Sequence, residues 1–317
     1  MVSPILEVNT MPMPGPTEMN TIIECVPNFS EGRRKEVVDK IVFSIRSVPG
    51  IKVLDVETDP DHNRSVVTFI GGKDNIQEAA FRGARAATEL IDLTKHTGQH
   101  PRIGALDVLP FVPISGATME DCVEIANKVG ARIAKELKVP VYLYESAARR
   151  PDRVNLEDIR KAGFEWLRDA ILTDESRFPD FGLRKVHPTA GATVVGARMP
   201  LLAFNINLKT TDLRIAKDIA KKIRTSGGGF PKLKALGFEL KARDCVQVSM
   251  NLTDYTVTPL STVFEAVRKE CDTRGVEILD GELIGLIPLN AVCDVAAKYL
   301  KLPKLTKDQV LEGKIWG

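Results

Sequence analysis

The sequence predicts an α+β protein built from two successive subdomains, each with the element order β-α-β-β-α-β. Two observations predict this class: apolar runs bounded by turn residues alternate with segments of helical period, and the same order of elements occurs twice. The chain has 317 residues, of which 44% are hydrophobic and 27% charged, as in ordinary globular proteins. Because single cores rarely grow beyond about 250–300 residues, this length also favours two subdomains.

The first round of elements begins at an apolar run, residues 22–26, that ends at the turn signal Pro27-Asn28. A helix follows over 33–48, where Val37, Val38, Ile41, Val42 and Ile45 recur at helical spacing. The later elements are strands at 51–56 and 65–71, a helix at 75–93 rich in small residues, and a strand at 105–114. This order is the ferredoxin-like pattern.

Further elements are expected at 119–137 (helix), 139–144 (strand) and 155–170 (helix), before a second round that starts near Ala192. Its elements are strands at 193–196 and 201–208, a helix at 212–225, strands at 235–241 and 245–252, a helix at 258–274 and an extended run at 277–287. Thr258 is the expected N-cap of its second helix and Pro259 the first helical residue. We therefore expect a flexible N-terminal extension (1–20) and two ferredoxin-like subdomains (21–199 and 200–317), packed with a cleft between them.

Charge and cysteine content exclude several classes of protein. The net charge of +2 gives no concentrated positive charge for nucleic-acid binding. The five scattered cysteines form no CxxC pair, so a disulfide framework or thiolate zinc site is not expected, and a reducing compartment fits better. No apolar run approaches the roughly 20 residues that cross a membrane. Residues 1–20 hold four prolines and no basic residue, unlike a signal peptide. The expected location is the cytoplasm.

Candidate chemistry centres on four histidines, His62, His96, His100 and His187, which all lie in predicted loops. The i, i+4 spacing of His96 and His100 suggests a zinc pair, but no glutamate base accompanies them, and Gly98 and Pro101 would break the required helix. General acid–base catalysis therefore fits this loop better, because imidazole exchanges a proton near neutral pH. The alternative is a helix end with ordinary solvated histidines.

Arg102 in the same loop is a candidate substrate-binding residue, since a guanidinium can hold a carboxylate. The loop 59–64 resembles a calcium loop, but Arg64 occupies the position of the glycine and Ile70 that of the glutamate, so the resemblance fails. Its polar residues are typical either of a turn or of a cleft wall, and in the second case Asn63 and Arg64 are further candidates for substrate binding.

Residues 179–191 form a long basic segment bounded by glycine, and 226–230 form a glycine-rich one. The first is either an interdomain linker or a ligand loop whose backbone amides and Arg184 or Lys185 contact an anionic, partly aromatic ligand. The second admits close backbone approach but matches no phosphate-binding pattern.

Several segments together resemble the glutamate formimidoyltransferases. They are Glu24-Cys25-Val26-Pro27-Asn28-Phe29-Ser30-Glu31-Gly32, the stretch 96–108, Val139-Pro140-Val141-Tyr142-Leu143-Tyr144, Pro179-Asp180-Phe181-Gly182, Gly191-Ala192-Thr193-Val194 and Ala203-Phe204-Asn205-Ile206-Asn207-Leu208. The resemblance extends from about residue 21 to the end of the chain. It implies two ferredoxin-like subdomains, in agreement with the pattern of elements.

The resemblance implies transfer of a formimino group from N-formimino-L-glutamate to N5 of tetrahydrofolate, in histidine degradation. It assigns the catalytic role to His100, and it makes tetrahydrofolate a co-substrate without any metal. It places folate contacts at Gly182, Leu183, Arg184, Lys185, Val186, His187, Pro188, Thr189, Ala190, Gly191 and Gly228. It also implies a homodimer, and a separate cyclodeaminase to receive the product.

The expected chemistry needs one proton carrier. N5 attacks the amidine carbon, and the tetrahedral intermediate then expels the glutamate nitrogen. One histidine can accept the first proton and deliver it to the leaving nitrogen. Two alternatives remain: a metal-dependent amidohydrolase that uses His62, His96, His100 and aspartates, and a non-catalytic folate-binding module.

Overall fold

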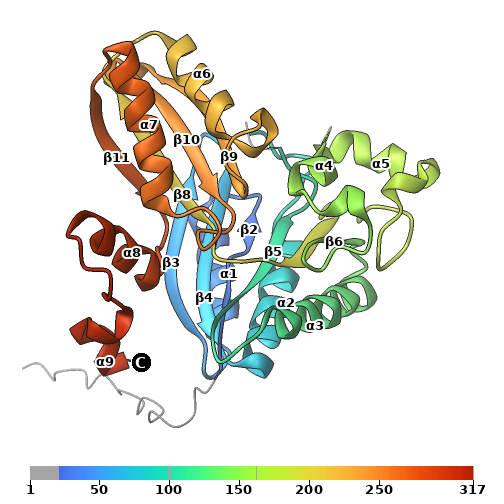
Figure 1. Cartoon of the computed structure of the whole chain (residues 1–317). Helices are drawn as coiled ribbons and strands as arrows, with labels where there is room; N and C mark the ends of the chain where they lie inside the picture. The colour runs from blue at the N-terminus through green and yellow to red at the C-terminus, as the bar shows by residue number, and fades with distance from the viewer. Residues whose placement is uncertain (1–20, 99–100, 162, 317) are drawn as a thin grey trace, which may run out of the picture. The chain divides into compact units, whose positions relative to one another are not determined.

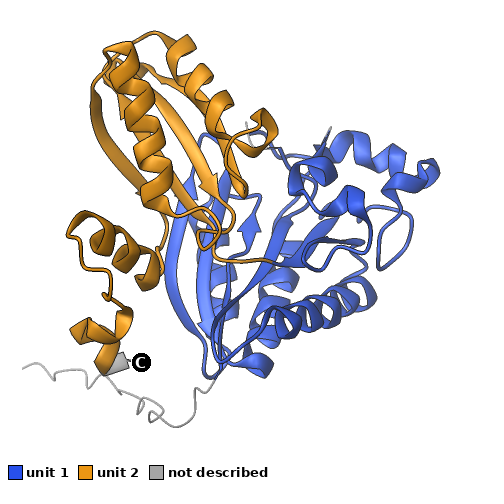
Figure 2. Ribbon diagram, viewed as in Figure 1, with its two compact units in different colours: residues 1–197 blue, residues 198–317 orange. Residues whose placement is uncertain are grey.

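The computed structural model describes residues 21–98, 101–161 and 163–316, and divides the chain into two compact units between Ala197 and Arg198 (Figure 2). Each unit has its own β-sheet with helices packed on it, so the predicted mixture of helices and strands is confirmed (Figure 1). The expected N-terminal extension and His100 lie outside the described residues. Within the described part of the chain, every helix is too short or too polar to span a bilayer.

The sheet of the first unit has the order β3-β4-β1/β2-β5-β7-β6, where β1 and β2 each pair with both β4 and β5. Its strands are β1 (Ile22–Cys25), β2 (Asn28–Phe29), β3 (Lys52–Asp59), β4 (Arg64–Gly71), β5 (Leu106–Ser115), β6 (Val141–Glu145) and β7 (Thr193–Ala197). Neighbours from β3 to β5 are antiparallel, whereas β7 runs parallel to β5 and β6. Several loops therefore meet at one end of this sheet: those that end β2 and β3 and those that precede β4, β5 and β7.

The helices of the first unit are α1 (Lys35–Arg46), α2 (Lys73–Leu90), α3 (Met119–Arg132), α4 (Leu156–Arg160) and α5 (Gly163–Thr173). The apolar stripe predicted on α1 is buried, and α1 packs on α2 and α2 on α3. Small residues allow this close contact: a Cβ at Gly83 would lie 3.0 Å from the side chain of Ile45. A capping box between Thr118 and Asp121 starts α3.

The sheet of the second unit has the order β11-β8-β10-β9 and is antiparallel throughout. Its strands are β8 (Leu202–Leu208), β9 (Leu233–Leu240), β10 (Cys245–Leu252) and β11 (Ile278–Ile284), and its helices are α6 (Leu213–Ile223), α7 (Leu260–Arg274), α8 (Leu289–Tyr299) and α9 (Leu311–Trp316). Alternate residues of β8 and β10, such as Ile206 and Val248, join α6 and α7 in one core. The other face of these strands carries Asn205, Asn207 and Gln247.

Three sequence predictions need correction. The second round does not begin near Ala192, because β7 pairs with β5 and β6 and the chain therefore stays in the first sheet as far as Ala197. The single helix expected at 155–170 is two helices, since Gly163 adopts φ +74°. The N-cap of α7 is Pro259, and Leu260 is its first residue, because the hydroxyl of Thr258 donates to the carbonyl of Pro231 instead. Helices α8 and α9 were not predicted.

Candidate active site

Asn63 joins three loops at one end of the first sheet. Its side-chain oxygen accepts a hydrogen bond from the backbone of Gly32 at 2.9 Å, and its side-chain nitrogen donates to the carbonyl of Thr97 at 3.0 Å. The residue is 8% exposed and adopts φ +50°, a conformation that asparagine tolerates better than most residues. The amide of Asn63 is therefore used to hold the backbone around the segment that contains His100.

His96 lies in the same network and is bound through one ring nitrogen. Its Nε2 donates to the backbone carbonyl of Asn63 at 2.9 Å, so the proton is on Nε2 and Nδ1 is an acceptor. Burial lowers the pKa of His96, and although the hydrogen bond with Asn63 opposes this, the charge of Arg102 lowers the pKa further. His96 thus has a defined tautomer and one ring nitrogen bound to the β3–β4 loop.

Arg102 holds the other end of this segment. Its Nη2 donates to the carbonyl of His96 at 3.1 Å and to Glu165 of α5 at 2.9 Å. The guanidinium is 12% exposed, whereas Glu165 is 63% exposed. Arg102 therefore ties the backbone of His96 to α5.

Asp107 and Arg160 form a buried ion pair beside these loops. The Arg160 Nη2 lies 2.5 Å from the Asp107 Oδ2, with side chains 13% and 1% exposed. The other oxygen of Asp107 accepts from the backbone of Ile103 at 2.8 Å. Because breaking a buried ion pair leaves an uncompensated charge, this pair holds the start of β5 firmly against α4.

The turn 187–191 is bound directly to the backbone that follows His100. Backbone hydrogen bonds join Ala105 to Ala190 (2.9 Å) and Ala192 to Ile103 (2.8 Å), and Leu93 donates to Thr189 (2.8 Å). The turn is closed by two backbone hydrogen bonds between His187 and Gly191. The second half of the predicted folate loop therefore lies beside residues 103–105, only a few positions from His100.

His187 stabilises this turn rather than presenting a free imidazole acceptor. Its Nδ1 accepts from the backbone of Ala190 at 3.0 Å and lies 3.4 Å from the backbone nitrogen of Thr189. Burial lowers the pKa of His187, and because Nδ1 accepts the hydrogen bond of Ala190, the ring proton is on Nε2. The hydrogen bond inside the turn therefore fixes the direction of the ring.

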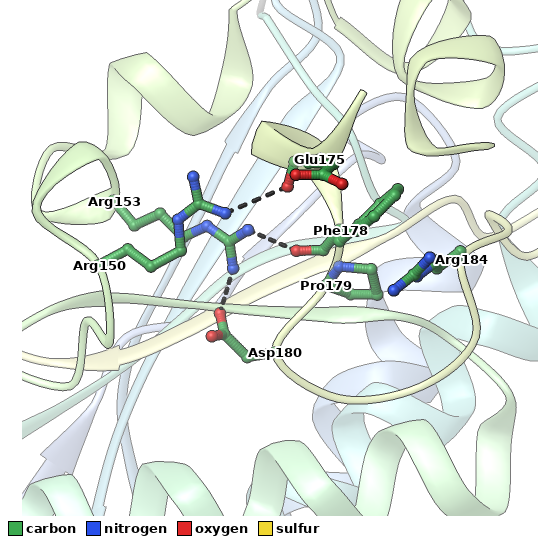
Figure 3. Close-up of a pocket in the computed structure, with 7 residues that line it drawn as sticks. All are labelled: Arg150, Arg153, Glu175, Phe178, Pro179, Asp180 and Arg184. Carbon is green, nitrogen blue, oxygen red and sulfur yellow. Dashed lines mark hydrogen bonds and ion pairs between the residues drawn. The ribbon is translucent and has the colours of Figure 1, made fainter. Parts of the chain in front are cut away.

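The first half of the predicted folate loop lies apart from this turn. Gly182 adopts φ +96° against Pro140 and Ala134, and Leu183, Arg184 and Lys185 are exposed. Arg184 stacks on the ring of Phe178 at 3.7 Å. Together they border a pocket of about 380 Å³, where Figure 3 shows Arg150 and Arg153 on the side facing Arg184.

Internal contacts neutralise most of the charge around this pocket. Arg153 is paired with Asp180 at 2.6 Å, and Arg150 with Asp152 at 3.0 Å (Figure 3 shows the first pair). Gly228, the remaining predicted folate contact, ends a 3₁₀ turn of the second unit at φ +81°. No described residue comes within 4 Å of the place where its Cβ would be.

The structure therefore gathers Asn63, Arg64, Arg102 and the turn 187–191 within the first unit, around a segment whose centre, His100, lies outside the described residues. Among the residues described, no group of three or more His, Cys, Asp and Glu side chains is placed to hold a metal ion. Sequence reasoning missed Asp107, Arg160 and Glu165. Asp107 is a charge in an otherwise apolar run, whereas Arg160 and Glu165 lie among other charged residues, and neither pattern reveals a distant partner.

We expect Asn63→Ala to lower the free energy of unfolding by about 2–3 kcal/mol, because it leaves two partly buried backbone groups without partners. Urea denaturation followed by circular dichroism measures this. Asn155→Ala is the matched control, since the exposed Asn155 amide contacts only the side chain of Asp158 and its loss should cost less than about 0.5 kcal/mol. Equal effects of the two substitutions would contradict the bridging role of Asn63.

Family models match almost the whole chain. The N-terminal subdomain of the formiminotransferase domain matches residues 22–198, and the formiminotransferase domain matches residues 203–313. The chain belongs to the formiminotransferase family, as the resemblance in its sequence predicted.

Its relatives include single-function and longer proteins. The glutamate formimidoyltransferase of Streptococcus pyogenes serotype M1 is 48% identical over 94% of this chain and 100% of its own length. That of Thermoplasma acidophilum is 47% identical over 93% of this chain and 97% of its own length. The mouse formimidoyltransferase-cyclodeaminase is 45% identical over 90% of this chain, which matches 54% of the mouse protein.

Proposed function

We propose that this chain transfers the formimino group of N-formimino-L-glutamate to N5 of tetrahydrofolate, with His100 as the general acid and base. Membership of the formiminotransferase family supports the reaction. The observation that carries the arrangement of the site is the set of backbone hydrogen bonds between the turn 187–191 and residues 103–105. These bonds bring the proposed folate loop next to the segment that contains His100.

The reaction needs two substrates held together and one proton moved. N5 of tetrahydrofolate attacks the formimino carbon, and the new N5–C bond gives a tetrahedral intermediate. His100 accepts the N5 proton and delivers it to the glutamate nitrogen as the C–N bond to glutamate breaks, which releases glutamate. Such proton transfer contributes about 10²–10⁴-fold, and holding two substrates together contributes up to roughly 7–11 kcal/mol.

The local structure suits this role. Asn63 and Arg102 hold the segment around His100 from both sides, and catalytic groups need a backbone that is fixed in this way. One ring nitrogen each of His96 and His187 is engaged in a backbone hydrogen bond, and burial lowers the pKa of both. These contacts support the proposal that His100 carries the proton, while the other two histidines hold the surrounding backbone.

Mixing the purified chain with formiminoglutamate and tetrahydrofolate tests the proposal. We expect the absorbance change of 5-formimino-tetrahydrofolate and one glutamate released per folate consumed. A folate-binding module would bind tetrahydrofolate without this change. A metal-dependent amidohydrolase would release glutamate without tetrahydrofolate and lose activity after treatment with a chelator. Either of these two results would overturn the proposal.

Two structural expectations accompany it. We infer that each unit contains a ferredoxin-like subdomain, supported by the orders β3-β4-β1-β5 and β11-β8-β10-β9, in which the first and third strands of each round are neighbours. In the first unit, β6 and β7 extend this arrangement on one side. We also propose that the chain forms a homodimer, by analogy with the family.

A further inference from the structure

Arg64 differs from the other candidate substrate-binding residues in having no side-chain hydrogen bond or ion pair with any residue that the structure describes. The amide of Asn63 bonds to Gly32 and Thr97, and the guanidinium of Arg102 bonds to His96 and Glu165. Throughout 21–98, 101–161 and 163–316, by contrast, no hydrogen bond or ion pair reaches the Arg64 guanidinium, and the residue is partly buried. A partly buried cation without a counter-ion has lost part of its hydration, which favours an anion that binds there.

The surroundings of Arg64 leave its charge uncompensated. Burial, and after it the charge of Arg160, lower the pKa of Arg64, and the carboxylates of Asp59, Glu57 and Asp107 raise it by less. Asp59 is bonded to His62, whose Nδ1 lies 2.6 Å from its carboxylate, and Asp107 is paired with Arg160. Two of these three carboxylates, those of Asp59 and Asp107, are therefore committed to other groups.

The backbone of Arg64 is fixed in position. Arg64 is the first residue of β4 and lies opposite Asp59 of β3. Gly32 packs so closely on it that a Cβ there would lie 2.6 Å from both the backbone nitrogen and the carbonyl oxygen of Arg64. A guanidinium on such a rigid element is preorganised to bind a planar anion through two hydrogen bonds.

We propose that Arg64 binds a carboxylate of the formiminoglutamate donor and thereby selects a dicarboxylate substrate. The inference rests on the proposed function, which supplies the donor. It also rests on the contacts of Asn63, the residue that precedes Arg64. Asn63 holds the backbone of Thr97, and Thr97 is three residues from His100. A donor carboxylate on Arg64 is thus tied, through one residue, to the segment that carries the proton-transferring histidine.

Arg64→Met tests the proposal, because methionine retains an apolar stem and removes the charge. We expect KM for formiminoglutamate to rise about 10- to 100-fold, as for loss of a hydrogen-bonded charge, while KM for tetrahydrofolate changes less than about twofold. Arg64→Lys keeps a charge but loses the two-point geometry, and should give an intermediate KM. Arg168→Met, on the exposed Arg168 of α5, is the matched control and should change neither KM.

Truncated donors show whether the contact is direct. In 4-(formiminoamino)butyrate the α-carboxylate is missing, and in N-formimino-glutamine the side-chain carboxylate is an amide. We expect one of these donors to have a raised KM with the unaltered enzyme. Its KM should not rise further in Arg64→Met, because the contact with Arg64 is already absent. The KM of the other donor should rise in Arg64→Met by the same factor as that of formiminoglutamate.

Isothermal titration of each variant with formiminoglutamate alone gives a readout that is independent of turnover. An active enzyme whose donor affinity is unchanged in both Arg64 variants would overturn the proposal. So would a variant that weakens only tetrahydrofolate, because the carboxylates of its glutamate tail would then be the ligand. If the unaltered chain neither binds nor consumes formiminoglutamate, the proposed function itself fails. Thermal melting of Arg64→Met and Arg64→Lys separates loss of binding from loss of folding.

Discussion

Replacing His100 by alanine should reduce kcat for formimino transfer by about 10²–10⁴-fold and leave tetrahydrofolate binding intact. The reason is that imidazole carries the proton from N5 to the leaving nitrogen, whereas the proposed folate contacts come from the turn 187–191 and Gly228. The hydrogen bonds that attach this turn use backbone atoms of residues 93 and 103–105, which the substitution does not remove. Stopped-flow absorbance measures the transfer step, and fluorescence titration measures folate affinity.

His62→Asn is a useful control for this result. His62 is 48% exposed and bonds to Asp59 of its own loop, so its loss should leave most of the activity. Added imidazole should restore part of the rate of His100→Ala and none of the rate in variants that fail to bind folate. Near-normal turnover by His100→Ala would show that another group moves the proton.

Gly191→Ala should lower the free energy of unfolding by about 2–5 kcal/mol and weaken tetrahydrofolate binding. Gly191 adopts φ +70°, which costs an L-residue about 1–2 kcal/mol. A Cβ there would also lie 2.2 Å from the carbonyl oxygen of Ile103 and 2.8 Å from the side chain of Leu93, and relieving such overlap costs about 1–3 kcal/mol. Because the carbonyl belongs to backbone, the turn must move away from the segment after His100.

Gly228→Ala separates the cost of a positive φ from the cost of steric overlap. Gly228 also has a positive φ, of +81°, but a Cβ there would have no atom of the described residues within 4 Å. We therefore expect a loss of only about 1–2 kcal/mol. Urea denaturation of both variants gives the comparison, and folate titration shows whether either backbone position contacts the ligand. Equal losses would mean that the close approach of Gly191 to Ile103 contributes nothing.

The sequence predicted most elements of the fold because their signals are local. Helix α1 was indicated by the spacing of Val37, Ile41 and Ile45, all of which are buried. What it could not predict was the partner of each strand. The strand β7 has the same apolar composition whichever sheet it joins, and only its parallel pairing with β5 and β6 assigns it to the first unit. The break between α4 and α5 was missed because the expected helix was continued through Gly163.

The candidate site shows the same division between local and distant information. Residue types and their resemblance to a family were enough to single out the loop with His100, the loop with Asn63 and Arg64, and the segment ending at Gly191. From the sequence, Asn63, Arg64 and Arg102 were equally good candidates for substrate binding. The structure separates them, because the polar side-chain atoms of Asn63 and Arg102 bond to backbone and to Glu165, whereas the Arg64 guanidinium makes no such bond with the residues that the structure describes.

By itself, then, the sequence determined the class of fold, the family and the loops that carry chemistry. These depend on the period of apolar residues and on short runs of residue types, which neighbouring positions in the chain define. Only the tertiary structure decided which polar side chains support the backbone. That depends on hydrogen bonds and ion pairs between residues far apart in sequence, such as Asn63 with Thr97 or Arg160 with Asp107.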